Sequence, residues 1–116
     1  MTEARLPAGR AAVVAYAYAQ LGQPYRFGAA GGGSFDCSGL TMRAFARAGV
    51  RLVHKAAEQT GRTVSLGQAR AGDLVKWGSY HVGVYVGNGY VIHAPKPGDH
   101  VKKSRLWGNY RIVRVL

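Results

Sequence analysis

The spacing of apolar residues changes along the chain, from a helical period in the first half to a strand period in the second. Residues 11–21 are rich in Ala and Val, lack a helix breaker and precede Gly22, which predicts a helix. A second helix is predicted over residues 41–48, ended by Gly49, because apolar positions recur on one side: Leu40, Ala44, Phe45 and Ala48. Its other side carries arginines, so this helix should bury one face and expose a basic one.

Segments with strand character follow in the second half of the chain. They are short, rich in Val, Ile and aromatic residues, and bounded by Gly or Pro, at residues 73–77, 81–86, 90–94 and 110–116. Helices followed by consecutive hairpins predict an α+β fold with an antiparallel sheet. We expect a flexible leader over residues 1–10 and a single domain over residues 11–116, with residues 56–63 open between loop and a short helical turn.

The turn between the two central strands decides whether His81 and His93 share one face of the sheet. A two-residue Asn88-Gly89 turn, the commonest form for this dipeptide, would place the two histidines on opposite faces. A three-residue loop, with Gly89 in the left-handed region forming a bulge, places His93 opposite Gly83 and diagonal to His81. This second register groups the apolar residues on one core face, so we predict it: Val82, Val84, Val86, Tyr90, Ile92 and Ala94.

The composition describes a folded domain with a strongly basic surface. The chain has 116 residues, 47% hydrophobic and 18% charged, which suits one compact domain and excludes a disordered basic tail. Lys and Arg number 16 against 5 Asp and Glu, and the net charge of +11 implies an anionic partner: nucleic acid, membrane or an acidic polymer. No apolar run approaches the ~18 residues of a membrane span, and the first ten residues lack the order of a signal peptide.

Cys37 is the single cysteine of the chain, which excludes an intrachain disulfide. It falls in the first turn of the second helix, where unpaired N–H groups and the positive dipole end lower a thiol pKa and can hold an oxyanion. His81 could serve as its base, and His93 could orient His81 through the other ring nitrogen. This arrangement fits transfer of an acyl group from an amide to Cys37, followed by hydrolysis.

Each of these residues also has a plainer interpretation. A lone cysteine is usually a small buried hydrophobe, and a strand histidine is usually a hydrogen-bonded structural residue. Asp36 alone would be a helix cap and Tyr25 a half-buried aromatic, while His54 and His100 are expected to lack a chemical role. One cysteine and two histidines also allow a zinc site, but no close ligand pair has the usual spacing, so we expect neither a metal nor a cofactor.

The order of five segments is more specific than any one of them: 24–28 (Pro-Tyr-Arg-Phe-Gly), 35–40 (Phe-Asp-Cys-Ser-Gly-Leu), 72–75 (Gly-Asp-Leu-Val), 81–89 (His-Val-Gly-Val-Tyr-Val-Gly-Asn-Gly) and 92–95 (Ile-His-Ala-Pro). Over about residues 11–115 the chain closely resembles the NlpC/P60 family of cysteine peptidases. The resemblance implies a papain-like α+β fold that acts on the stem peptides of bacterial peptidoglycan. Such enzymes typically cut after γ-D-glutamate and before a diamino acid such as diaminopimelate.

The resemblance also implies a role for each motif residue. By the family pattern Cys37 is the nucleophile, His81 is the base and His93 is the third, orienting residue. Tyr25 matches the family tyrosine whose hydroxyl can help to hold the oxyanion. Two residues flank the nucleophile at positions where some members recognise the stem peptide: Asp36 and Ser38.

The chain departs from the family pattern at residues 52–59. Many members have Leu-Pro-Arg followed by Thr or Ser and later Gln, whereas this chain reads Leu-Val-His-Lys-Ala-Ala-Glu-Gln. Because this segment often borders the substrate groove, the missing proline and hydroxyl residue bear on substrate preference more than on catalysis. A milder change is Val-Lys-Trp at residues 75–77, where the family strand usually ends in two aromatics.

We therefore expect a monomeric peptidoglycan endopeptidase that also meets anionic wall polymers through its basic helix face and residues 96–114. Two alternatives stay open: a catalytically inactive wall-binding module, and a Cys–His amidase or transferase on another amide. A specific nucleic-acid binder is not expected, because the chain lacks a reader motif. Since the implied substrates lie outside the cytoplasm, we expect a secreted, cell-wall or periplasmic location, reached as an excised domain, an effector or a phage lysin.

Overall fold

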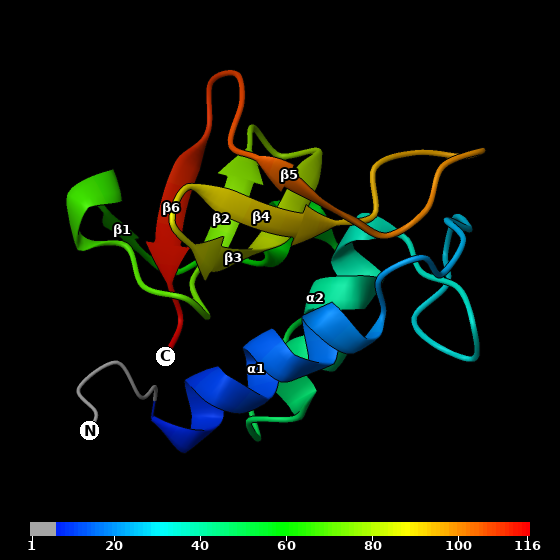
Figure 1. Ribbon diagram of the computed structural model, residues 1–116, viewed down its shortest axis with the longest axis horizontal. Coiled ribbons are helices and arrows are strands. Elements are labelled where there is room, and N and C mark those ends of the chain that lie inside the picture. The colour runs from blue at the N-terminus through cyan, green and yellow to red at the C-terminus, as the bar shows by residue number, and fades with distance from the viewer. Residues whose placement is uncertain (1–6) are drawn as a thin grey trace.

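Residues 7–116, which the computed structural model describes, form two helices and a six-stranded antiparallel sheet. Helices α1 (Ala8–Ala19) and α2 (Cys37–Ala46) lie on the same side of the sheet (Figure 1). Two short 3-10 turns are η1 (Ala56–Glu58) and η2 (Leu66–Gln68). The strands run across the sheet in the order β1-β6-β2-β3-β4-β5, with these bounds: β1 Arg62–Val64, β2 Leu74–Trp77, β3 His81–Gly87, β4 Tyr90–His93, β5 Lys102–Arg105 and β6 Arg111–Arg114. The predicted α+β fold is confirmed.

The two edge strands, β1 and β5, do not appear among the strands that the sequence predicts. β5 reads Lys-Lys-Ser-Arg, and β1 reads Arg-Thr-Val with one buried residue, Val64. Edge strands commonly carry charge, so they lack the apolar alternation that marks a central strand. β5 nonetheless pairs with β4 along its whole length, which brings Ser104 next to the strand that carries His93.

Alternating side chains give the sheet two faces, each with its own buried cluster. The face toward the helices joins them in the main core, and its buried strand residues are Leu74, Val82, Val84, Ile92 and Val113. The face away from the helices buries a second cluster: Val64, Val75, Trp77, Tyr85, Val91 and Ile112. The rings of His81 and His93 lie beside Trp77, with centroids 5.1 and 6.2 Å from its ring, so both histidines belong to this second face.

The β3–β4 hairpin has the predicted register, although its bulge lies elsewhere. The pairs shift by one residue between the body of the hairpin and its turn: Val84–Ile92 and Tyr85–Val91, then Gly87–Tyr90. The turn is the two-residue form, with φ of 54° at Asn88 and 82° at Gly89. The extra residue is Val86 in β3, so the prediction of a bulge at Gly89 is wrong. The register beyond the bulge sets the β-carbon of His93 against the backbone of Gly83, as predicted.

Helix α1 begins earlier than the sequence predicts, and it ends two residues sooner. Residues 8–10, expected in the leader, form its first turn. Long-range contacts hold this turn, because Arg10 is 5% exposed, pairs with the Asp73 carboxylate at 3.0 Å and donates to two distant backbone carbonyls. Such contacts leave no local sequence signal. The rest of the predicted leader that falls in residues 1–6 lies outside the described residues.

Asp73 ties α1 to the sheet. Its buried carboxylate accepts hydrogen bonds from the Arg114 guanidinium at 3.0 and 2.9 Å and from the backbone N–H of Arg70 at 2.8 Å, and it pairs with Arg10. Burial alone would raise the pKa of Asp73. The hydrogen bonds from Arg114, Arg70 and Arg10 outweigh burial and hold that pKa below its ordinary value.

We predict that Asp73→Asn lowers the free energy of unfolding by about 3–5 kcal/mol at pH 7, because two arginines then lack their buried partner. Since the folded-state pKa of Asp73 is lowered, its contribution is present above the unfolded value of about 4 and is lost as pH falls through the folded value. Urea unfolding at pH 7 and pH 3 measures this, and the gap between wild type and variant should narrow at pH 3. Glu58→Gln is the control, because Glu58 pairs with Lys55 only at the exposed surface. An equal loss in both variants would contradict the prediction.

Candidate active site

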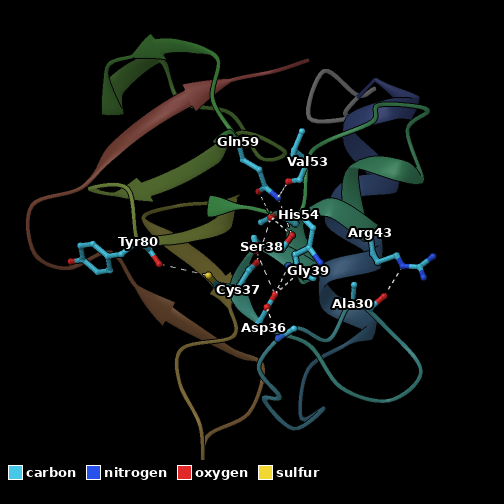
Figure 2. Close-up of polar contacts among 12 residues, drawn as sticks. Ala30, Asp36, Cys37, Ser38, Gly39, Arg43, Val53, His54, Gln59 and Tyr80 are labelled. Atoms are coloured by element: carbon cyan, nitrogen blue, oxygen red, sulfur yellow. Dashed lines mark hydrogen bonds and ion pairs between the residues drawn. The ribbon is translucent and has the colours of Figure 1, made fainter. Parts of the chain in front are cut away.

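Cys37 opens helix α2, as the sequence predicts, because Asp36 caps the helix. One carboxylate oxygen of Asp36 accepts the backbone N–H of Gly39 at 2.7 Å, and the other accepts the N–H of Gly28 at 2.8 Å (Figure 2). The plainer interpretation of Asp36 as a cap therefore describes its structural role. The cap fixes the direction in which the first turn presents the Cys37 side chain.

Gly39 is required by a close approach of backbone. A β-carbon at this position would overlap the carbonyl oxygen of Ala29 and press on the Asp36 carboxylate. The Ala29 carbonyl also accepts the N–H of Asp36 at 2.9 Å, so the loop over residues 29–34 packs directly on the start of α2. A side chain at residue 39 would therefore clash with the protein's own backbone at Ala29.

A chain of hydrogen bonds links the two predicted histidines to a serine. The Nε2 atom of His81 lies 2.9 Å from Nδ1 of His93, and Nε2 of His93 lies 3.1 Å from the Ser104 hydroxyl. Both residues are buried, with 8% of the surface of His81 and 2% of the surface of His93 exposed. The Trp107 ring covers His93 at 4.8 Å between centroids and stacks on Trp77 at 4.2 Å. The diagonal placement predicted for the histidines brings their rings into direct contact.

The Cys37 sulfur lies against the backbone on both sides of His81. It is 3.9 Å from the carbonyl oxygen of Tyr80 (Figure 2), and the backbone N–H of Val82 on the other side acts to lower the pKa of the thiol. Because His81 meets His93 through Nε2, its Nδ1 is the ring nitrogen left for the thiol, and Nδ1 is also the nitrogen nearer to the backbone. The cysteine comes from the helix layer and reaches the backbone where β3 begins, whereas the rings of His81 and His93 lie on the opposite face of the sheet.

Burial decides the charge state of these groups. It raises the pKa of the Cys37 thiol, the N–H groups of Val82, Ser38 and Cys37 itself oppose the rise, and the charge of Asp36 adds to it. The helix start therefore does not lower this pKa on balance, contrary to the expectation from the sequence. Burial also lowers the pKa of His81 to about 4. At neutral pH the resting site holds a thiol and a neutral imidazole.

A cavity of about 530 Å³ opens beside Cys37. It is lined by three other predicted residues, Tyr25, Asp36 and Ser38. Burial raises the pKa of the Tyr25 hydroxyl, and the charges of Cys37 and Asp36 raise it further, which reflects how close the three groups lie. The structure thus brings these four residues together around one cavity.

His54, which is expected to lack a chemical role, also lines this cavity. Its Nε2 atom is 2.8 Å from the Asp36 carboxylate, and it stands in the segment over residues 52–59 that departs from the family pattern. Gln59 fastens the same segment to α2, because its fully buried side chain donates to the carbonyls of Ser38 and Val53, both at 2.9 Å. The sequence of residues 52–59 has no periodic pattern that could have revealed these contacts. His100, the other histidine expected to lack a chemical role, is exposed.

Residues 7–116 contain neither a metal-binding cluster nor a helix that could span a membrane. No three His, Cys, Asp or Glu side chains of this part gather closely enough to hold a metal ion. Its helices are too short or too polar to cross a membrane.

The fold of two helices packed on a six-stranded antiparallel sheet is shared by solved structures of NlpC/P60 domains. The NlpC/p60 domain of the peptidoglycan hydrolase SagA superposes with a TM-score of 0.80 at 36% identity, covering 90% of this chain and 98% of that one. RipD of Mycobacterium tuberculosis, described as a non-catalytic NlpC/p60 domain protein adapted to peptidoglycan binding, superposes with a TM-score of 0.81 at 30% identity. That match covers 96% of this chain and all of the RipD chain.

The model of the NlpC/P60 family matches residues 22–116, and the chain belongs to this family. The peptidoglycan endopeptidase RipA of Mycolicibacterium smegmatis is 38% identical over 110 residues, which cover 79% of this chain and 22% of that protein. This chain spans between 19% and 25% of the length of three curated relatives that it matches in sequence. The resemblance seen in the sequence is confirmed at the level of family and fold.

We predict that His81 and His93 stay neutral down to about pH 5 and titrate as a coupled pair with apparent pKa values of about 4. Burial disfavours the imidazolium form of both rings, and the charges of His81 and Lys102 lower the pKa of His93 further. NMR titration of the ring Cε1–H signals measures this, with single His→Ala variants for assignment. His100→Ala should leave the low-pH transition in place. A ring that is charged at pH 6 would refute the prediction.

Proposed function

We propose that this chain is a cysteine peptidase that hydrolyses an amide bond in the stem peptides of bacterial peptidoglycan. One observation carries the proposal: the Cys37 sulfur lies against the backbone on both sides of His81, whose far ring nitrogen is hydrogen-bonded to His93. Family membership supports the substrate class, because RipA is named a peptidoglycan endopeptidase and SagA a peptidoglycan hydrolase.

In the first half of the reaction, Nδ1 of His81 takes the proton from the Cys37 thiol, and the thiolate adds to the carbonyl carbon of the amide. The oxyanion receives hydrogen bonds from backbone N–H groups at the start of α2 and from the Tyr25 hydroxyl. The carbon–nitrogen bond then breaks. The amine leaves with the proton that His81 held, and the acyl group stays on sulfur as a thioester.

In the second half, a water molecule gives a proton to Nδ1 of His81 and adds to the thioester carbonyl. The carbon–sulfur bond breaks, and the Cys37 thiolate recovers its proton from His81 as the product acid leaves. His93 keeps the ring of His81 in place during both steps, because it holds Nε2 at 2.9 Å. A neutral resting pair suits this sequence, since His81 must accept a proton twice.

The proposed bond is the γ-D-glutamyl link to a diamino acid such as diaminopimelate, as the family pattern implies. The cavity of about 530 Å³ beside Cys37 supports a substrate of peptide size. Asp36 and Ser38 line it, which supports a part in recognising the stem peptide. Asp36 already accepts three bonds at 2.7–2.8 Å, so a substrate amine would share this carboxylate with His54.

A second candidate is a wall-binding module without activity, because RipD combines this fold with a binding role. The enzyme is favoured because the Cys37 sulfur lies beside the backbone of His81, whose ring is hydrogen-bonded to His93. A Cys–His amidase or transferase on another amide would use the same three residues and differ only in what fills the cavity.

We further propose that the chain acts as a monomer outside the cytoplasm. There its charge of +11 draws it to anionic wall polymers. The exposed arginines of α2 support such contacts, since Arg43 and Arg47 face solvent. Attraction through charge alone should weaken as salt rises.

We predict that the purified chain releases a new amine and a shorter fragment from defined muropeptides. Cys37→Ala should abolish release, because no other group can form the thioester. His81→Ala should lower kcat by about 10²–10⁴-fold, the usual contribution of a positioned base, and His93→Ala should also lower it severely. Mass spectrometry of the products identifies the bond that is cut.

His100→Ala is the matched control for these variants, because the exposed ring of His100 pairs with Asp99 at the surface, and this variant should retain wild-type turnover. If wild-type protein releases nothing while it still binds the muropeptides, the wall-binding alternative replaces the enzyme. Near-normal turnover in His93→Ala would refute the orienting role.

A further inference from the structure

Ser104 ends the hydrogen-bond chain that begins at His81 and passes through His93, yet no motif includes it and the steps above do not use it. It lies in β5 opposite Val91 of β4, so its side chain shares the sheet face that carries His93. Its hydroxyl is 3.1 Å from Nε2 of His93, the nitrogen that does not face His81.

The chemistry of the proposed base fixes the direction of these bonds. To take a proton at Nδ1, neutral His81 must carry its hydrogen on Nε2, so it donates to Nδ1 of His93. His93 must then carry its own hydrogen on Nε2, and the group within reach there is the Ser104 oxygen. The opposite arrangement of hydrogens would place a hydrogen on Nδ1 of His81 and block it as a base.

The requirement becomes stricter once the thiol proton has moved. His81 is then an imidazolium with hydrogens on both nitrogens, and it can only donate to His93. His93 in turn can only donate to Ser104. A hydroxyl rotates to accept this bond, whereas a methyl group cannot.

We infer that Ser104 is a positioning residue of the proposed reaction, whose oxygen accepts the Nε2–H of His93 and thereby keeps His81 oriented, with its hydrogen on Nε2 and its Nδ1 free to act as the base. The inference rests on the proposed function. Ser104 touches neither the thiol nor the substrate, and it acts through His93.

The charges around His93 leave this task to Ser104. Lys102 and Asp99 act on the ring with opposite sign, and they pair with each other at 2.9 Å. A second cavity, of about 340 Å³, borders His93, Ser104 and Trp107, and Lys96 also lines it. No carboxylate among residues 7–116 is hydrogen-bonded to the ring, so a neutral hydroxyl is the acceptor that the imidazolium state uses. Because solvent can enter this cavity, water would replace part of a lost hydroxyl.

The test compares kcat, KM and the pH profile of muropeptide cleavage in three variants of Ser104. Ser104→Ala should lower kcat about tenfold with KM unchanged, because the lost hydrogen bond to His93 supports the imidazolium form of His81. Ser104→Thr keeps the oxygen and should stay within about twofold of wild type. Ser104→Asp adds an acceptor with negative charge and should move the acidic limb of the profile upward by about one pH unit or more.

Ser65→Ala is the matched control, because Ser65 is exposed just before η2, its side chain caps no backbone N–H group, and it lies outside residues 96–114. It should leave the pH profile unchanged, and thermal unfolding of each variant should show a folded domain. Unchanged kcat in Ser104→Ala, or a Ser104→Thr variant as impaired as Ser104→Ala, would overturn the inference.

Titration of the histidine ring signals by NMR separates this inference from the proposed function, because it needs no substrate. Ser104→Asp should raise the apparent pKa of the histidine pair, and Ser104→Ala should not raise it. If wild-type protein cleaves no muropeptide but Ser104→Asp shifts the pair, the reaction is refuted while the coupling stands. If Ser104→Asp leaves the pair unshifted, the inference fails whether or not the protein cleaves.

Discussion

The single extra residue at Val86 in β3 is the constraint on which the site depends. The two-residue turn pairs Gly87 with Tyr90. The bulge then shifts the pairing by one residue, so that Tyr85 lies opposite Val91 in the rest of the hairpin. Since a slip of one residue exchanges the two faces of a strand, the bulge decides that His81 and His93 share a face. It also sets His93 against Gly83, where the absence of a side chain leaves room: a β-carbon there would lie 3.0 Å from that of His93.

Burial is the second organising effect, and it works through charge. The histidines lie under Trp77 and Trp107, where the cost of an imidazolium is high, and the same burial keeps the Cys37 thiol protonated. A resting thiolate–imidazolium pair is therefore not what this site stabilises. In the reaction proposed above, its hydrogen bonds would instead prepare for transfer of the proton as the substrate carbonyl takes the negative charge.

The central part of the fold and site could be predicted because burial constrains it. Three valines must face the core, which fixes the hairpin register, and the Asp36 cap places Cys37 at a helix start. Contacts made at edges and over long distances could not be predicted. β5 carries charges instead of an apolar pattern, so Ser104 gave no signal, and the pairing of Arg10 with Asp73 joins residues far apart in sequence. The bulge was misplaced because the apolar pattern fixes a register but not the residue that absorbs the shift.

Residues 52–59 depart from the family pattern without losing the contacts that anchor them. Gln59 donates to the carbonyl of residue 53, and a backbone carbonyl accepts that bond whether the residue is Pro or Val. The missing proline thus removes stiffness and leaves the anchor. His54, which stands where many members have Arg, contacts Asp36 with an imidazole ring in place of a guanidinium. The departure therefore alters the hydrogen-bonding groups of the cavity wall and leaves the start of α2 in place. Under the proposed function, the choice of stem peptide, more than the chemistry, is where this chain should differ from its relatives.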